Sequence, residues 1–392
     1  MSSIFSRRTI SHWCTYLVLI LVNISYCPGI ILTTNYKIIM AIIMTAITVS
    51  LLINIKDDII FAASLYLYYG VYALLLCSIV FLFSNVFLFT ATINIYLAIT
   101  CFLFGYCNND YNEDFIIKCM KIYILSALFL GLYSVYTNLG GFVITEQYAF
   151  KVKNSSGVLL GTAIILTIFV LFSAKNKALY IIWASVALLL SACLLTFRCR
   201  TSIIAVCIAF LIVLYKKNML KGLLQRPLVF ISFVVIAICL YVSDAIPIDY
   251  INDALFKNTD TSDLNSVTSG RIDIYKRALS VFYNDPLLGN SSQNINLYSI
   301  DNYIINVLGS YGIIGALLMF PPYILTFIIC AYGILYKSTN GLYSYFCLLI
   351  ILLTSFTEGP YPFGPGTPVI CAWFLLGWTY KASQLEIQNS DS

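Results

Sequence analysis

The sequence has little charge for its length. Only 10% of its 392 residues are charged, whereas 60% are hydrophobic. Soluble domains have about a quarter of their residues charged and about half apolar. A soluble globular protein is therefore excluded, and the composition indicates a chain that lies largely within a membrane.

Several motifs of soluble enzymes and metalloproteins are also absent. No Cys-x-x-Cys pair occurs, and nearly all of the 13 cysteines lie inside apolar stretches, where cysteine behaves as a small hydrophobic residue. Neither a disulfide framework nor a zinc site is predicted. His-Glu-x-x-His, Gly-x-Ser-x-Gly and Walker-type motifs are missing too. We therefore expect no metal, no cofactor and no nucleic-acid partner, and we attribute the net charge of +5 to cations that hold cytoplasmic loops in place.

Long apolar runs make up most of what is present. A membrane span needs roughly 20 mostly apolar residues, and runs of this kind predict an all-α, polytopic membrane protein with about twelve transmembrane helices. The whole chain, 1–392, forms one such domain. The predicted spans are 12–32, 37–54, 60–83, 86–106, 115–138, 157–173, 178–196, 201–215, 227–243, 313–336, 342–357 and 366–380.

The basic residues predict the orientation of these spans. Arg7 and Arg8 place the N-terminus in the cytoplasm, and most lysines and arginines then fall on the cytoplasmic side, as do both termini. The first apolar run is long enough to be a span, so we expect no cleavable signal. The segment 302–336 has two interpretations. We prefer a short interfacial helix at 302–312 before one span, rather than two spans split at Pro321-Pro322, because the following lysines then stay inside.

A long polar segment at 244–301, on the outer side, is the largest interruption of this pattern, and the loop region extends to residue 312 with short helices inserted. Loops of this length are usually functional, the alternative being a disordered connector. Within it, Arg271–Asn284 has apolar and polar residues on opposite arcs at helical spacing. Thr268-Ser269-Gly270 gives a start signal and Asp285-Pro286 a stop. We predict an amphipathic helix there.

Of the 22 lysines and arginines, nine fall on the predicted outer side, against the usual bias, and six of these nine are grouped. They occur as three pairs: Lys151 and Lys153, Arg198 and Arg200, and Arg271 and Arg277. A cation at a membrane boundary indicates a functional site unless it reaches phospholipid headgroups, which is the alternative for Arg198 and Arg200. Arginine binds phosphate well because its planar fork offers paired donors and stays charged. A pyrophosphate-linked lipid is therefore a natural ligand.

Three outer carboxylates are candidates for an acid, a base or an electrostatic partner. They are Asp285, Asp301 and Glu358, the last in a proline-rich turn where it is otherwise a solvated loop acid. The single histidine, His12, lies near the cytoplasmic end of the first span. Histidine therefore cannot be the base on the outer side.

Three segments resemble the O-antigen ligase and polymerase superfamily of bacterial envelope proteins. Phe197-Arg-Cys-Arg-Thr-Ser-Ile-Ile204 is similar to its Ser-Arg-Thr motif, with Arg200 as the motif arginine and Cys199 in place of serine. Ser269-Gly-Arg, the amphipathic helix and Pro286-Leu-Leu-Gly289 resemble the next segment, and Asp301 to Gly315, ending in Gly-Ile-Ile-Gly, resembles the third. The three cover about 197–336 and share the outer side.

The resemblance implies a GT-C-like membrane glycosyltransferase that needs no metal. Its substrate would be an undecaprenyl-pyrophosphate-linked oligosaccharide on the periplasmic face of the bacterial inner membrane. Arg200 and Arg271 would hold the pyrophosphate and stabilise the leaving group, with Arg198, Arg277, Lys151 and Lys153 as further binding candidates by location. Family ligases typically have a histidine where this chain has Asp301, which leaves Asp301 or Glu358 as the base.

This difference favours an O-antigen polymerase, which joins lipid-linked repeats, over a ligase. Membrane lipids and a chain-length regulator are further partners that this function implies. A transporter or flippase for lipid-linked oligosaccharides is the alternative from another class. It is disfavoured because the spans contain almost no ionisable residue at mid-depth and no obvious internal repeat.

Overall fold

The structure is a computed structural model, and it describes all residues except 1–5, 32, 82–86, 109, 138–152, 175, 198, 217–270, 290–299, 337–340, 359–360, 365–366 and 391–392. The described part of the chain is all-helical. Its α-helices are α1 (Arg7–Ile24), α2 (Thr34–Asn54), α3 (Ile59–Phe81), α4 (Phe87–Tyr106), α5 (Glu113–Thr137), α7 (Lys153–Phe172), α8 (Lys177–Thr196), α9 (Arg200–Lys216), α14 (Arg271–Asn284), α15 (Tyr303–Tyr336), α16 (Leu342–Ser355) and α17 (Ile370–Ser390). Short 3₁₀ turns at Ile55–Asp58 and Thr367–Val369 precede α3 and α17.

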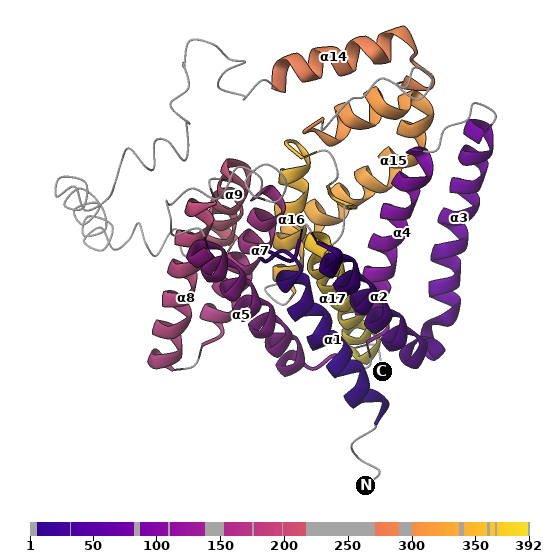
Figure 1. The fold of residues 1–392 in the computed structure, drawn as a ribbon. Helices are drawn as coiled ribbons and strands as arrows, with labels where there is room; N and C mark the ends of the chain where they lie inside the picture. Colours follow the sequence, from indigo (N-terminus) through magenta and orange to yellow (C-terminus); the bar gives the residue numbers. More distant parts are fainter. Residues whose placement is uncertain are drawn as a thin grey trace, which may run out of the picture.

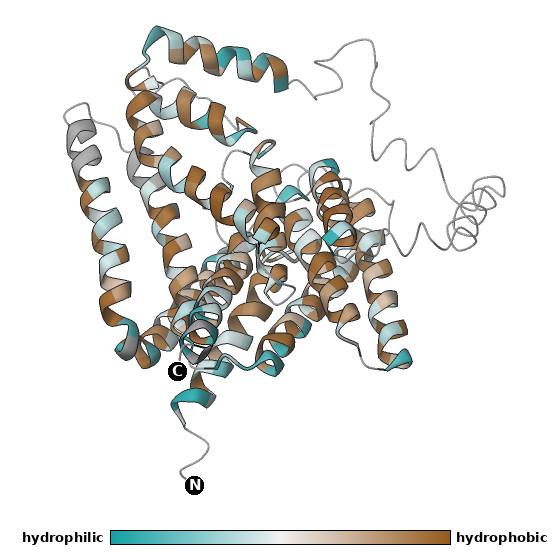
Figure 2. Ribbon diagram, turned by 180° about the vertical axis from the view of Figure 1, so that it is seen from behind, coloured by the Kyte–Doolittle hydropathy of each residue, from teal (hydrophilic) through white to brown (hydrophobic). Residues whose placement is uncertain are grey.

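An α-helix lies in every predicted span that falls within the described residues, although α1 ends at Ile24, before the predicted end of its span at residue 32. The predicted span 227–243 lies outside the described residues. Among the described residues, five helices are long and apolar enough to cross a membrane: α2, α5, α7, α8 and α15. Other apolar helical stretches are shorter, for example Leu342–Ser355. Apolar residues cover most of the bundle, whereas α14 is markedly more polar (Figure 2). The fold is that of a helical membrane protein, and the number of spans remains a prediction.

Helix α7 forms the centre of one half of the bundle. Nearly all of its residues from Ser156 to Val170 are buried, and it packs against α5, α8, α9 and α16 (Figure 1). In the other half, α17 packs against α4. A side chain at Gly105 or Gly377 would collide with the backbone of the opposite helix. Small residues of this kind allow close helix packing in membrane proteins.

Helix α15 changes direction at Gly312, where the backbone has φ 62° and ψ −160°. This is a conformation that only glycine adopts readily. The segment therefore forms a short helix before Gly312 and a longer helix after it, which is the interpretation that the sequence favoured. The longer helix continues through Pro321-Pro322. Pro321 has no N–H to donate to the carbonyl of Leu317, and the hydroxyl of Tyr72 on α3 donates to that carbonyl instead.

The break at Gly312 is also the docking point of the amphipathic helix. Helix α14 ends in a turn at 285–289, and the carbonyls of Pro286 and Leu287 accept hydrogen bonds from the Ile313 and Ile314 amides, at 2.8 and 3.3 Å. Backbone hydrogen bonds thus join the Pro-Leu-Leu-Gly and Gly-Ile-Ile-Gly motifs. The helix prediction for Arg271–Asn284 is confirmed, with Ala278 and Val281 buried against α15.

Charged side chains gather at two separate places. At one, Asp110 pairs with Arg8 (Nη2–Oδ2 2.7 Å) and His12 (Nε2–Oδ2 3.0 Å), and Lys381 pairs with Asp58 at 2.5 Å. All of these residues lie in segments that the sequence predicts at the cytoplasmic ends of the spans. Helix α14 lies at the opposite end of the molecule from the start of α1 and the end of α17 (Figure 1). This arrangement is consistent with the predicted alternation of spans, and the sides themselves stay a prediction.

Candidate functional site

The structure brings together the four residues that the sequence proposed as catalytic. Arg271 is the first residue of α14, and its Nε lies 3.1 Å from Oδ2 of Asp301, just before α15. Its Nη2 lies 3.7 Å from Oε1 of Glu358, which follows the end of α16. Arg200, the first residue of α9, is close enough to Arg271 for the two charges to interact. The site therefore joins segments that are up to 158 residues apart in the sequence.

Three helices begin with a cation at this site: α7 with Lys153, α9 with Arg200 and α14 with Arg271. A helix N-terminus carries partial positive charge, so a cation in the first turn is unfavourable by about 0.3–1 kcal/mol. The N-terminal end of α15 also lies here, because Asp301 immediately precedes it. The site therefore concentrates positive potential, which favours an anion.

Burial and neighbouring charge change the protonation of two of these groups. The Glu358 side chain is 13% exposed, and burial, together with the charge of Asp301, raises the pKa of its carboxyl from 4.5 to about 8, although Arg271 and Lys153 oppose the shift. Burial and the charge of Arg271 lower the pKa of Arg200. Glu358 is therefore mostly protonated at neutral pH, and the ionised form, which can accept a proton, predominates only above about pH 8.

Asp301 has a different environment, although it lies beside the same arginine. Its carboxylate accepts a hydrogen bond from Nε of Arg271, and its backbone carbonyl accepts one from the Tyr275 hydroxyl at 2.7 Å. Tyr275 lies one turn after Arg271 on α14, so both side chains contact the same residue. Asp301 therefore fixes the start of α14 to the start of α15. Within the described residues, Nε and Nη2 are the Arg271 atoms with carboxylate partners, and its remaining donors can bind a ligand.

A second set of contacts holds Glu358 in place. The Nδ2 group of Asn154, at the start of α7, donates to Oε1 of Glu358. The Oδ1 atom of Asn154 accepts a bond from the buried thiol of Cys199, at 3.6 Å, and that thiol also contacts the Ser202 hydroxyl at 3.1 Å. The side chain of Asn302 caps α15 and donates to the carbonyl of Phe356 at 2.9 Å. The ends of α7, α9, α15 and α16 are thus connected by hydrogen bonds.

The remaining predicted residues differ in their placement. Lys153 lies close enough to Glu358 to act on its carboxyl, whereas Arg277 is exposed on α14. Lys151 and Arg198 lie outside the described residues. Asp285 has a structural contact, because its Oδ1 accepts the amide of Leu288 at 3.2 Å in the turn after α14.

Sequence reasoning missed three residues that support the site: Asn154, Tyr275 and Asn302. Asn154 begins a short Asn-Ser-Ser sequence, which by itself does not indicate a site. The adjacent Lys153 and the one-turn spacing between Arg271 and Tyr275 were the signals that could have identified the first two. His12, in contrast, lies in the other charged group, bound to Asp110.

No protein-family model matches the chain, and no curated protein matches it. The functional interpretation therefore depends on the residues of the site.

Proposed function

We propose that the chain is a polymerase of repeat-unit polysaccharides, such as an O-antigen polymerase, that acts on undecaprenyl-pyrophosphate-linked oligosaccharides. It would work in the bacterial inner membrane with its site on the periplasmic face. The observation that carries the proposal is the cluster of Arg200, Arg271 and Lys153 around two carboxylates. Cations at the starts of three helices suit a pyrophosphate group, because its charge offsets theirs.

The reaction follows from the chemistry of such a donor. The hydroxyl of the acceptor sugar forms a bond to the anomeric carbon of the donor glycan, and the bond from that carbon to the pyrophosphate oxygen breaks. The electron pair leaves with the pyrophosphate, where Arg200 and Arg271 stabilise the developing charge. The hydroxyl proton passes to a carboxylate of the protein.

Glu358 is the better candidate for that carboxylate. A general base works best when its pKa lies near the working pH, and the pKa of Glu358 is raised to about 8. The Asp301 carboxylate has the shorter contact with Arg271, at 3.1 Å compared with 3.7 Å for Glu358. We assign Glu358 as the base and Asp301 as the residue that positions Arg271.

Deletion of the gene tests the proposal against the related ligase function. A cell without the polymerase should make lipopolysaccharide with a single repeat unit, and the wild-type gene should restore long chains. A cell without a ligase would make bare core and accumulate polymer on its lipid carrier. Bare core in the deletion strain would overturn the polymerase assignment. Complementation with Glu358→Gln, which keeps the size of the side chain but removes the base, should leave single repeats.

A further inference from the structure

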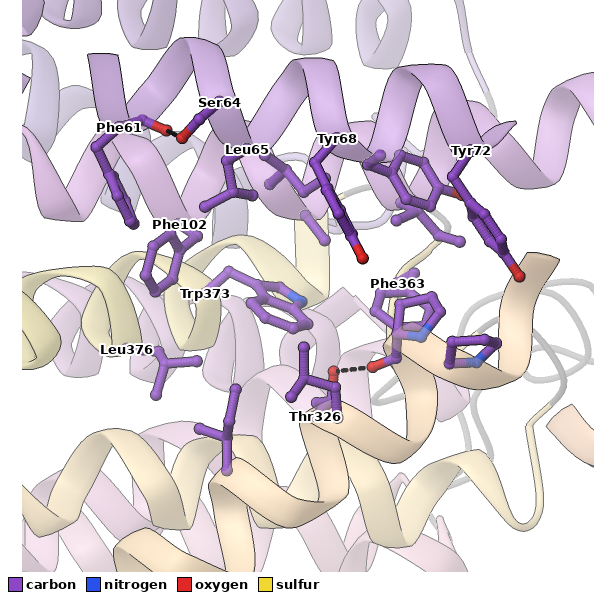
Figure 3. Close-up of a pocket in the computed structure, with 18 residues that line it drawn as sticks. Phe61, Ser64, Leu65, Tyr68, Tyr72, Phe102, Thr326, Phe363, Trp373 and Leu376 are labelled. Carbon is purple, nitrogen blue, oxygen red and sulfur yellow. Dashed lines mark hydrogen bonds between the residues drawn. The ribbon is translucent and has the colours of Figure 1, made fainter. Parts of the chain in front are cut away.

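A large apolar groove lies between α3, α4, α15 and α17. Its volume is about 810 Å³, within the range typical of ligand pockets. Aromatic side chains from both sides point into it, including Tyr68, Phe102 and Trp373 (Figure 3). None of the described residues that line the groove carries a formal charge. A ligand that fits this lining is a hydrocarbon chain.

The groove is accessible from the surroundings of the bundle along α3. Tyr68, which lines it, is 86% exposed, and Leu67 and Leu74 beside it on α3 are exposed as well. Helix α3 stands at the edge of the bundle (Figure 1). In a membrane, an opening of this kind faces lipid, so a chain can enter from the bilayer without crossing water.

The wall of the groove lies next to the two segments that carry the site carboxylates. Phe363, in the groove wall, follows Glu358 by five residues. Tyr303, two residues after Asp301, places its ring 6.1 Å from that of Phe363, and Phe363 stacks on Trp373 at 5.9 Å. Packed aromatic rings therefore place the groove wall beside the segments of Asp301 and Glu358. A ligand that occupied both places would have an anionic head and a hydrocarbon chain.

We propose that this groove binds the hydrocarbon chain of the lipid-linked donor while Arg200 and Arg271 hold its pyrophosphate. The inference rests on the proposed function, because that function supplies the donor. The groove then fixes the direction from which the donor approaches, with its sugar beyond the pyrophosphate, near Glu358. Burial of the chain adds binding energy in proportion to the apolar area it covers.

Steady-state kinetics with two donors test the groove. Ser64 lies on α3 in the groove wall and its hydroxyl bonds to the carbonyl of Phe61 at 2.8 Å. Ser64→Trp should obstruct the groove and raise the KM of a long-chain polyprenyl donor relative to a geranyl donor about tenfold, the loss expected when a few methylene groups lose contact. Ala98→Phe, from α4, should have the same effect from the opposite wall.

A matched control is Ser185→Trp, because Ser185 is also exposed and bonds to its own helix, at 3.0 Å to Ile181, but lies on α8. It should leave the ratio of the two KM values unchanged. Equal effects of Ser64→Trp on both donors, or no effect on either, would overturn the proposal.

Photo-crosslinking separates this inference from the proposed function. A polyprenyl pyrophosphate with a diazirine in its chain, and without sugar, should label peptides of α3, α4, α15 or α17. Excess unlabelled polyprenyl pyrophosphate should compete, whereas phosphatidylglycerol should not. Labelling elsewhere, or equal competition by phosphatidylglycerol, would remove the groove as a donor site. Specific labelling by a protein that elongates no glycan would keep the groove and refute the polymerase.

Discussion

Glu358→Gln changes a buried acid into a neutral side chain of the same size, and it tests the electrostatics of the site most sharply. In the folded protein the pKa of Glu358 is raised from 4.5 to about 8, whereas in the unfolded chain it returns to its ordinary value. The folded state therefore holds a proton that the unfolded state has lost between these two pH values. Stability must fall as pH rises through this interval.

The size of this effect follows from the shift. One pKa unit corresponds to about 1.4 kcal/mol, so ionisation of Glu358 costs the folded protein up to about 5 kcal/mol above pH 8, on the basis of a shift from 4.5 to about 8. Glu358→Gln removes the cost. The variant should be more stable than the wild type, and its advantage should grow between pH 5 and pH 9.

Thermal unfolding in detergent measures this directly. The wild-type Tm should fall over that pH interval by several degrees more than the Tm of Glu358→Gln. Glu386→Gln is the control, because Glu386 is exposed near the end of α17, and its pH dependence should match the wild type. Parallel curves of Tm against pH for wild type and Glu358→Gln would refute the reasoning.

The elongation rate of the wild type should rise with pH, with a midpoint near pH 8. Glu358→Gln should lose this pH-dependent rise and most of its activity.

Substitutions of Arg271, Asp301, Gly312 and Asp110 test the other parts of the proposed site and fold. Arg271→Ala should lower the elongation rate by about 10²-fold or more, whereas Lys276→Ala, which removes an exposed cation of the same helix, should leave it unchanged. Asp301→Asn should raise the KM for the donor, because Arg271 loses the partner of its Nε atom. Asp301→Glu keeps a carboxylate and should raise this KM less. Equal KM values for the wild type and both variants would contradict a positioning role. Gly312→Ala should destabilise the protein by about 1–3 kcal/mol through backbone strain, seen as a lower Tm, since its side chain would also meet the carbonyl of Leu287. Asp110→Ala should lower the Tm because Arg8 and His12 lose their partner, while elongation per folded molecule stays normal.

The local features of the fold were predictable from the sequence. Apolar runs marked the helices because a membrane span must satisfy its own backbone hydrogen bonds. The amphipathic pattern of α14 was equally clear, and its polar arc, including Asp273 and Lys276, is exposed. Sequence could not decide between a break at Gly312 and one at Pro321-Pro322, because the partners that bond to the backbone at both places come from distant segments.

The site was predictable in part for a geometric reason. Residues at the same end of a helix bundle are close in space. Because Arg200, Arg271, Asp301 and Glu358 were all predicted at the outer end, they were expected to lie near one another. Their pairing was not predictable, because it depends on how α14 docks on α15. Asn154 was missed for the same reason, since its role comes from a contact with Glu358 across 204 residues.

Reconstitution tests the central claim most directly. Purified protein in liposomes, supplied with lipid-linked repeats, should form longer lipid-linked glycans, and Arg271→Ala should insert normally but form none. Movement of the repeats across the bilayer without elongation would indicate a flippase and contradict the account, as would normal elongation by Arg271→Ala.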